Sequence, residues 1–404
     1  MRVLVVTQHY WPEPFNFSDI CEGLSARGHE VVVLTGLPNY PEGRVYDAYR
    51  NGARRRECKN GVQIVRSGMI PRGKSAPQRV ANYFSFSRNA KRVARELDSG
   101  FEAVMVMQSS PVMMAEPALA YAERTGAPVL LWCLDLWPAS LAAGGIAAGS
   151  APYRLFHRIS KRIYRGVDRI AVTSPLFKDY MEAEFGVDPK GVADLPQYAE
   201  DAFLAEVGGR PEGFDPSKIN LTFAGNVGSA QSVETVVGAA DRLKGDARFV
   251  FHIVGSGSSE ARCRDMAARL GLANVVFHGR RPLEDMPAFY GASDAMIATF
   301  ADDATLGYTL PRKVQSYLAA GKPVLGALAG EAARVVREAQ CGLVCPPEDA
   351  DGLARACAAF ADMPADERAR FGESARAYYL RHFTKDRFFE TLEGQLEELR
   401  RNRK

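Results

Sequence analysis

The sequence predicts an α/β protein built from two doubly wound parallel sheets, and three observations favour that fold class. The chain has 404 residues, more than a single domain usually needs. Short, nearly continuous apolar runs alternate with amphipathic helical segments, as in parallel sheets that helices cover on both faces. This alternation stops once, in a loop-like stretch at residues 201–217, and then starts again.

The first half of the chain holds six expected strands. Ser18 is the expected N-cap of the first helix, and Gly28 should end it. The strands are expected at residues 3–7, 31–35, 62–65, 104–108, 129–133 and 169–173, with helices at 18–27, 79–97, 116–124 and 153–164. This order of strands and helices is typical of a doubly wound sheet.

The second half repeats the same rhythm. Strands are expected at residues 220–224, 249–254, 275–278, 295–300 and 323–325, with helices at 233–243, 260–270, 313–320 and 332–339. From residue 349 onward the pattern is helical only. We therefore place the first domain at residues 1–205, the second at 206–380 and a last helix, crossing back to the first domain, at 381–404.

The composition is that of a globular protein, with 47% hydrophobic and 25% charged residues. No apolar run reaches the ~18 residues that a membrane-spanning helix needs, and the N-terminus does not read as a signal peptide. The seven cysteines are scattered, and no spacing predicts a zinc site. These features favour a cytoplasmic protein with reduced thiols.

Positive charge is concentrated in one part of the first domain. Residues 42–98 hold fourteen lysines and arginines against five acids, a net charge of +9. We call residues 44–98 the basic segment. It is a candidate for docking on an anionic membrane surface, and the alternative is a packed helix with a solvated basic side. It carries no nucleic-acid recognition motif, so we expect no nucleic-acid partner.

Short motifs are spread over nearly the whole chain. They are residues 3–13 (VLVVTQHYWPE), 27–31 (RGHEV), 135–138 (DLWP), 225–228 (GNVG) with Gln231, 253–257 (IVGSG), 277–280 (FHGR), 292–294 (ASD), 319–324 (AAGKPV) and 341–344 (CGLV). In this order they resemble the family 4 glycosyltransferases of the GT-B fold. Residues 37–41 (LPNYP) and the helix after Pro311 are most similar to the WbuB-type subgroup, the fucosamine transferases of bacterial surface polysaccharides.

The resemblance implies two Rossmann-like domains that face a central cleft. The second would bind a nucleotide-sugar donor, usually a UDP-sugar, and the first an acceptor. The family retains the anomeric configuration of the donor and generally needs no bound metal or other cofactor. The subgroup implies an N-acetylated deoxyhexosamine as donor sugar. The expected acceptor is a saccharide on a polyprenyl diphosphate at the inner face of the plasma membrane, in O-antigen or capsule synthesis.

Two stretches of the second domain are candidates for holding the donor diphosphate. Residues 225–228 follow an expected strand and precede a helix, where glycine lets a phosphate approach the backbone; the alternative is an ordinary tight turn. Lys313 and Arg312 stand at the start of an expected helix, where cations oppose the helix dipole. They are candidates for neutralising the leaving group, and the alternative is that both are solvated residues of the first turn. The expected donor residues here are Gly225, Asn226, Val227, Gln231, Thr309, Leu310, Arg312 and Lys313.

Other strand ends add further donor candidates. Gly255 and Ser256 end one strand, and the loop His278-Gly279-Arg280 should place backbone groups against the base, unless it is a plain loop. Many family members carry two glutamates eight residues apart. Here those positions are Gly307 and Gln315, and Gln315 can still hydrogen-bond a ribose through its amide oxygen. Glu331 either contacts the donor sugar or only begins a helix.

The acceptor candidates follow strand ends of the first domain, where open α/β sheets bind ligands. Glu13 and Asp135 are the catalytic candidates beside Lys313, and Asp135 is expected to polarise the acceptor hydroxyl. Where many family members have a histidine, this chain has Gln108, so no general base stands out. The expected acceptor-binding residues are Asn16, Asp19, Asn39 and Tyr40.

Two other functions fit the same fold. A sugar-nucleotide epimerase would bind the donor and need no acceptor, and a non-catalytic module would bind the donor without releasing nucleotide. A dinucleotide oxidoreductase is disfavoured because no Gly-x-Gly-x-x-Gly motif follows the first strand.

Overall fold

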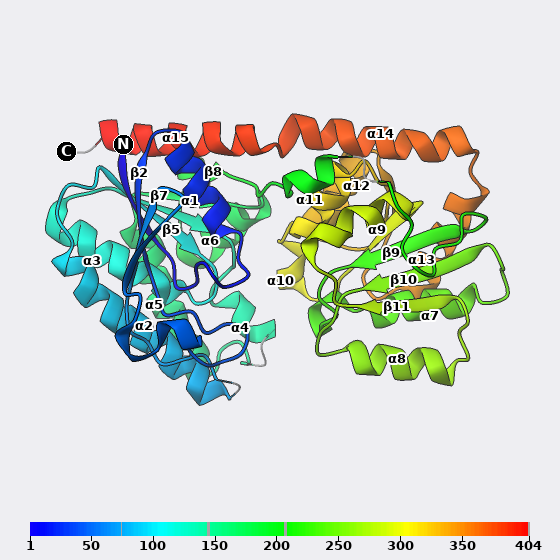
Figure 1. Cartoon of the computed structure of the whole chain (residues 1–404), viewed down its shortest axis with the longest axis horizontal. Helices are drawn as coiled ribbons and strands as arrows, with labels where there is room; N and C mark the ends of the chain where they lie inside the picture. Colours follow the sequence, from blue (N-terminus) through cyan, green and yellow to red (C-terminus); the bar gives the residue numbers. More distant parts are fainter. Residues whose placement is uncertain (74, 144–145, 206–207, 403–404) are drawn as a thin grey trace. The chain divides into compact units, whose positions relative to one another are not determined.

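The computed structural model describes residues 1–73, 75–143, 146–205 and 208–402, and the chain forms two compact units (Figure 1). Unit 1 comprises Met1–Leu195 together with Phe389–Lys404, and unit 2 comprises Pro196–Phe388. The division falls after Leu195, whereas the sequence placed it between residues 205 and 206; residue 206 and the end of the expected last helix, 403–404, lie outside the described residues.

Unit 1 is built on an eight-stranded sheet of order β3-β4-β2-β1-β5-β6-β7-β8. All neighbouring strands are parallel except β3 and β4. Its elements are β1 (Arg2–Val6), α1 (Phe17–Ala26), β2 (Glu30–Thr35), β3 (Arg56–Lys59), β4 (Val62–Arg66), α2 (Ala76–Glu96), β5 (Ala103–Gln108), α3 (Glu116–Thr125), β6 (Val129–Cys133), α4 (Ala139–Ala143), α5 (Ala151–Gly166), β7 (Arg169–Val172), α6 (Leu176–Phe185) and β8 (Val192–Asp194).

Unit 2 is built on a six-stranded, all-parallel sheet of order β11-β10-β9-β12-β13-β14. Its elements are β9 (Ile219–Ala224), α7 (Glu234–Arg242), β10 (Phe249–Val254), α8 (Glu260–Arg269), β11 (Val275–Gly279), α9 (Met286–Ala292), β12 (Ala295–Thr299), α10 (Ala304–Gly307), α11 (Arg312–Ala319), β13 (Val324–Ala327), α12 (Gly330–Glu338), β14 (Gly342–Cys345), α13 (Ala350–Asp362) and α14 (Ala365–His382). The last helix, α15 (Lys385–Arg401), begins in unit 2 and continues in unit 1.

The predicted fold class is confirmed, because every apolar run expected to be a strand is one in the sheets. The sequence missed the edge strands β3, β8 and β14, which are short or carry little apolar pattern. The first helix is also corrected: Asn16, not Ser18, stands at its N-cap, and the helix begins at Phe17. Gly28 follows the helix end with φ +88, as a residue that stops a helix often does.

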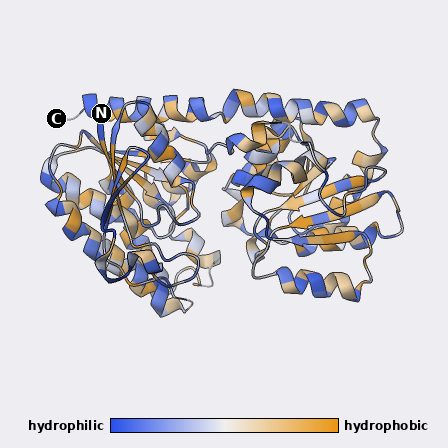
Figure 2. Ribbon diagram, viewed as in Figure 1, coloured by the Kyte–Doolittle hydropathy of each residue, from blue (hydrophilic) through white to orange (hydrophobic). Residues whose placement is uncertain are grey.

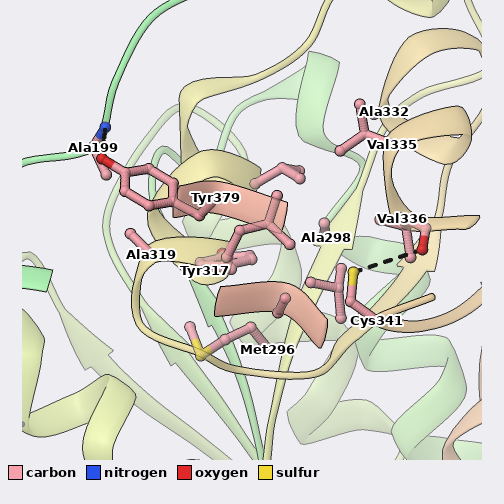
Figure 3. Packing of buried hydrophobic residues seen from close by; sticks show 14 of the residues in the cluster. Ala199, Met296, Ala298, Tyr317, Ala319, Ala332, Val335, Val336, Cys341 and Tyr379 are labelled. Carbon is pink, nitrogen blue, oxygen red and sulfur yellow. Dashed lines mark hydrogen bonds between the residues drawn. The ribbon is translucent and has the colours of Figure 1, made fainter. Parts of the chain in front are cut away.

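The core of unit 2 lies on both faces of its sheet. One cluster includes Met296, Tyr317 and Tyr379, whose hydroxyl accepts a hydrogen bond from the Ala199 backbone N–H at 3.2 Å (Figure 3). The other cluster packs α7, α8 and α13 against the opposite face, and the strands of this sheet are mainly hydrophobic (Figure 2). No helix in the described ranges is both long and apolar enough to cross a membrane.

Residues from Phe389 onward pack on unit 1. The Phe389 ring lies against Gly23 of α1, so closely that a Cβ on that glycine would meet the ring at 2.2 Å. Glu393 accepts from the His29 ring at 2.9 Å, and Glu398 pairs with Arg169 at 3.0 Å. Residues 389–402 are therefore an integral part of unit 1.

Candidate functional site

The loops after β9 and β10 meet backbone to backbone, because β9 lies between β10 and β12 in the sheet. Gly225 has φ +135 and Gly255 has φ +146, backbone conformations that residues with a side chain rarely adopt. A Cβ on Gly255 would lie 1.8 Å from the Gly225 carbonyl oxygen, and one on Gly257 would lie 2.3 Å from the Val227 carbonyl oxygen. These glycines are required for the two loops to approach each other at the carboxyl ends of the strands, which we call the donor edge.

Three backbone amides of these loops are occupied. The N–H of Gly225 donates to the Val254 carbonyl at 2.9 Å, that of Val227 to the Ser256 carbonyl at 2.9 Å, and that of Gly255 to the Gly279 carbonyl at 2.8 Å. These three N–H groups are not free to bind a phosphate, which leaves a larger part in neutralising its charge to side chains.

Lys313 supplies a side chain of that kind. It stands in the first turn of α11 and is half-buried as a residue, but its Nζ atom is buried and has no hydrogen-bond partner among the described residues. Nζ lies 4.0 Å from the centre of the Phe223 ring and against Gly225, where an added Cβ would be 3.3 Å away. Burial without a counter-ion lowers the pKa of Lys313 to about 7. A buried, unpaired ammonium at a glycine-lined sheet edge is a natural binding point for an anion.

Asn226 and Gln231 complete this edge. Asn226 is exposed, and its Nδ2 donates to Gln231 Oε1 at 3.0 Å. Both amides pack around Gly228, where a Cβ would meet Asn226 Nδ2 at 2.6 Å. The predicted donor residues Gly225, Asn226, Val227, Gln231, Gly255 and Ser256 are thus brought together with Lys313.

The other cation predicted for this helix has a different place. Arg312 pairs with Glu200 at 2.8 Å, and its Nε donates to the Tyr198 carbonyl at 3.2 Å. Gln315 is 1% exposed; its Nε2 donates to the Gln197 carbonyl at 2.5 Å, while its Oε1 has no partner among the described residues. Arg312 therefore anchors residues 198–200 to α11 and is not free to bind a leaving group as the sequence suggested, whereas the Gln315 oxygen is left to accept a hydrogen bond.

Three further donor candidates are largely covered. Leu310 is buried in the core of unit 2, and Thr309 beside it is half-buried. Glu331 is 1% exposed and accepts two hydrogen bonds from Arg334, at 2.8 and 2.6 Å. A Cβ on the preceding Gly330 would lie 1.9 Å from the Gly307 carbonyl oxygen, so α12 starts in contact with α10.

The His278 side chain belongs to a buried polar cluster. Its Nε2 lies 3.0 Å from His252 Nδ1, and His252 Nε2 lies 3.1 Å from Asn220 Oδ1. Burial lowers the pKa of His278, and it lowers that of His252 to about 3, so both rings are neutral near pH 7. The ring of His278 is thus held inside unit 2, and only the backbone of Gly279 and the exposed Arg280 are left for a ligand.

In unit 1 the predicted role of Glu13 is corrected. Its carboxylate is 4% exposed and is fully engaged: Oε1 accepts from the N–H groups of Asn39 (2.8 Å) and Tyr40 (2.7 Å), and Oε2 lies 3.0 Å from His9 Nδ1 and 3.2 Å from the Tyr10 N–H. With no oxygen left for a substrate, Glu13 is a positioning residue. The sequence did not single out His9, because nothing local shows that it is buried beside Glu13.

The loop that Glu13 holds contains two predicted acceptor residues. Asn39 is 1% exposed; it donates to the Leu37 carbonyl at 2.8 Å and accepts from the Arg72 N–H at 2.7 Å, so it shapes the loop and does not face solvent. Tyr40 and Arg72 line a cavity of about 430 Å³. Asn16 and Asp19 are half-buried at the start of α1, and neither lines this cavity.

Asp135 lies just after β6 and lines a second cavity of about 220 Å³. Its Oδ2 accepts a hydrogen bond from Trp137 Nε1 at 3.2 Å, and Gln108 Nε2 donates to its carbonyl at 2.9 Å. Burial raises the pKa of Asp135 to about 6, although the nearby Ser140 hydroxyl and the hydrogen bond from Trp137 oppose the shift. A carboxyl group with this pKa can accept a hydrogen bond from a hydroxyl near neutral pH. Within the described ranges, no group of three His, Cys, Asp or Glu side chains gathers as a metal site would require.

Comparisons with known proteins show the family of the chain. Residues 16–196 match the family "Glycosyl transferase 4-like domain", and residues 210–378 match "Glycosyl transferases group 1". The chain is 26% identical over 338 residues to "Putative colanic acid biosynthesis glycosyl transferase WcaI" of Escherichia coli (strain K12), covering 80% of this chain and 82% of that protein. It is 27% identical over 314 residues to "Probable glycosyltransferase WbjE" of Pseudomonas aeruginosa, covering 74% of each.

Solved structures show the same fold. The structure of Anabaena Alr3699/HepE in complex with UDP and glucose has a TM-score of 0.72 and 14% identity, covering 98% of this chain and 99% of that one. Each half of the chain thus matches a glycosyltransferase family, and both units have the parallel α/β sheets of that fold. The protein belongs to the family 4 glycosyltransferases of the GT-B fold.

Proposed function

We propose that this enzyme is a retaining glycosyltransferase that moves a sugar from a UDP-sugar to a lipid-linked saccharide during synthesis of a bacterial surface polysaccharide. The buried, unpaired ammonium of Lys313 beside Gly225 is the observation that carries the donor half of the proposal. The likeness to HepE, solved with UDP, supports uridine diphosphate as the leaving group. The name of WcaI, a putative glycosyl transferase of colanic acid biosynthesis, supports the setting in polysaccharide synthesis.

The reaction separates charge at the donor. The acceptor hydroxyl oxygen bonds to C1 of the donor sugar while the bond from C1 to the β-phosphate oxygen breaks, and its electron pair leaves with UDP. In the retaining course the hydroxyl proton passes to the departing phosphate oxygen. Lys313 opposes the negative charge that builds on the diphosphate, and the low-dielectric setting of Nζ strengthens that interaction.

Other residues serve the remaining parts of the donor and acceptor. The unpartnered Oε1 of Gln315 accepts from a ribose hydroxyl, and the exposed amides of Asn226 and Gln231 contact phosphate or sugar oxygens. Asp135 accepts a hydrogen bond from the acceptor hydroxyl. The WbuB-type likeness favours an N-acetylated deoxyhexosamine as the sugar.

The acceptor in this proposal is a saccharide on a polyprenyl diphosphate. The basic segment, residues 44–98, would bring the enzyme to the anionic inner face of the plasma membrane, and O-antigen or capsule would be the product. Lys74 of this segment lies outside the described residues. A sugar-nucleotide epimerase and a donor-binding module without activity are the competing functions.

The test combines donor binding with transfer. UDP-sugars are first ranked by the thermal stabilisation they give, and the best is then incubated with membrane extract while UDP release is followed. We expect release that needs both donor and extract and that Lys313→Met abolishes. The matched control is Lys244→Met, which removes an exposed lysine from the same unit.

Each competing function has its own outcome. Product formed from the donor without extract would indicate an epimerase. Stabilisation without UDP release in any extract would indicate a binding module, and no stabilisation by any nucleotide sugar would overturn the donor site.

A further inference from the structure

The cavity of about 220 Å³ in unit 1 carries chemistry that the donor site does not use. It lies among the first turns of α2, which contribute Arg79, the loop after β5 with Ser110, the loop after β6 with Asp135, and α5 with Phe156. Arg72, in the loop before α2, lines both this cavity and the neighbouring one of about 430 Å³. Every lining residue belongs to unit 1.

Two arginines face this space without a partner. No side-chain hydrogen bond or ion pair joins the guanidinium of Arg72 or Arg79 to another residue in the described ranges, although Arg72 stands 5.8 Å from the centre of the Tyr40 ring. Both side chains are half-buried. The planar fork of a guanidinium matches a phosphate in shape and charge, so two such groups at one cavity suit a ligand that carries phosphate.

The rim of the same cavity is apolar. Unit 1 exposes three large apolar side chains in the described ranges, Ile70 (50%), Phe84 (42%) and Leu155 (49%). None of the three lines the cavity itself, but each belongs to an element that does or is bonded to one: the Phe84 ring of α2 stacks on the lining Phe156 at 6.3 Å, Leu155 precedes Phe156 in α5, and the Ile70 N–H donates to Ser85 of α2 at 2.9 Å. Single exposed apolar residues are common, but three around one charged cavity indicate an amphiphilic ligand.

Positive charge surrounds this rim. Helix α5 has five lysines and arginines and no acid, and α2 adds the exposed Arg88, Arg92 and Arg95. Lys91 of α2 and Arg162 of α5 both pair with Glu116 of α3, so that acid already offsets the charge of these two residues. No ion pair in the described ranges joins Arg88, Arg92 or Arg95 to an acid, and unpaired cations of this kind attract an anionic surface.

We propose that this cavity binds the head group of a lipid-linked diphosphate, with Arg72 and Arg79 on the phosphates and with Ile70, Phe84 and Leu155 against the first part of the lipid chain. This proposal rests on the proposed function, because it names the residues of unit 1 that would receive the lipid-linked acceptor. Asp135 in the same cavity is then placed to meet a hydroxyl of the attached saccharide. Each part of the site thus suits one part of the ligand: the two arginines suit the phosphates, the Asp135 carboxyl group suits a sugar hydroxyl, and the apolar side chains suit the lipid.

Vesicle binding by the full-length protein tests this assignment. Phosphatidylcholine vesicles carry either polyprenyl diphosphate or phosphatidylglycerol at equal total charge, and the ratio of the two affinities is the preference for the diphosphate lipid. We expect a clear preference in the natural protein, reduced about tenfold in Arg72→Gln or Arg79→Gln, since each loses a charge-assisted hydrogen bond. Arg88→Gln, the matched control on α2, should weaken binding to both vesicles and keep the preference.

Two further arms separate the lipid from a free phosphate. Soluble pyrophosphate should compete weakly with the diphosphate vesicles, and Phe84→Ser should weaken vesicle binding without changing pyrophosphate binding. The proposal is overturned if the natural protein has no preference, if the double variant Arg72→Gln/Arg79→Gln keeps it, or if Phe84→Ser has no effect. Thermal stabilisation by a UDP-sugar should be the same in these variants as in the natural protein. If no UDP-sugar stabilises the natural protein, the proposed donor site is wrong, whatever the vesicles show.

Discussion

The ammonium of Lys313 lies against the backbone of Gly225, so that a Cβ on this glycine would be 3.3 Å from Nζ. Gly225 also has φ +135, a backbone conformation that is open almost only to glycine. One glycine thus permits both the path of the loop after β9 and the position of the buried Lys313 ammonium.

Gly225→Ala should therefore damage both the fold and the donor site. We expect a loss of about 1–3 kcal/mol in the free energy of unfolding, measured with urea, together with loss of stabilisation by UDP-sugars. Gly271→Ala is the control: Gly271 also has a positive φ, +63, but nothing lies within 4 Å of its Cβ position. If Gly225→Ala binds UDP-sugars as well as Gly271→Ala does, the loop is not part of the donor site.

Lys313→Met should change the pH dependence of stability. The folded pKa of about 7 lies below the unfolded value of 10.5, so the unfolded chain binds more protons between these values and stability rises with pH across that window. This one group should make the natural protein about 2 kcal/mol more stable near pH 9 than near pH 7, relative to the variant. Urea unfolding of both proteins across this range measures the difference.

The same variant should lose affinity for the donor while it keeps or gains stability near pH 7, because it removes a buried unpaired charge. A binding role and a structural role therefore predict opposite signs. Lower stability with unchanged UDP-sugar binding would show that Lys313 only packs in the core.

Asp135→Asn should alter the pH profile of transfer. The pKa of about 6 means that the carboxylate form, which accepts the strongest hydrogen bond from a hydroxyl, becomes dominant above pH 6. Activity in the natural protein should rise through about pH 6, and the variant should lose this rise along with at least about tenfold of its rate. UDP release at saturating donor measures both. If Asp135→Asn still shows the rise in activity through about pH 6, another group is responsible for that rise.

Glu13→Gln should destabilise unit 1 without touching donor binding. An amide has one acceptor oxygen and would place an NH₂ group toward donors that Glu13 now accepts from, so we expect a loss of about 1–3 kcal/mol. Glu123→Gln, on the exposed side of α3, is the control and should be near neutral. Normal stability with lost transfer would restore a direct catalytic role to Glu13.

Much of the fold could be predicted, because a buried parallel strand needs apolar residues on both faces and leaves a continuous run in the sequence. The runs at β1, β5, β6, β9 and β10 are of this kind. The edge strand β3 (RECK) is half exposed and has no such run, so the sequence missed it. Its register comes from pairing with β4, which no local pattern encodes.

The site residues divide in the same way. The sequence by itself determined which residues follow the carboxyl ends of strands, and so it predicted the glycine loops and Asp135 as site residues. It predicted Lys313 from its place at the start of a helix. Only the tertiary structure decided what each side chain meets: it buried Lys313 without a counter-ion, tied Arg312 to Glu200 and closed Glu13 around His9 and the Asn39–Tyr40 amides. Arg72 and Arg79 were part of a run of charge in the sequence, and folding brought them to the cavity of Asp135. The physical reason is that the residue type fixes the charge a side chain can carry, whereas its solvation and its partners depend on residues far away along the chain.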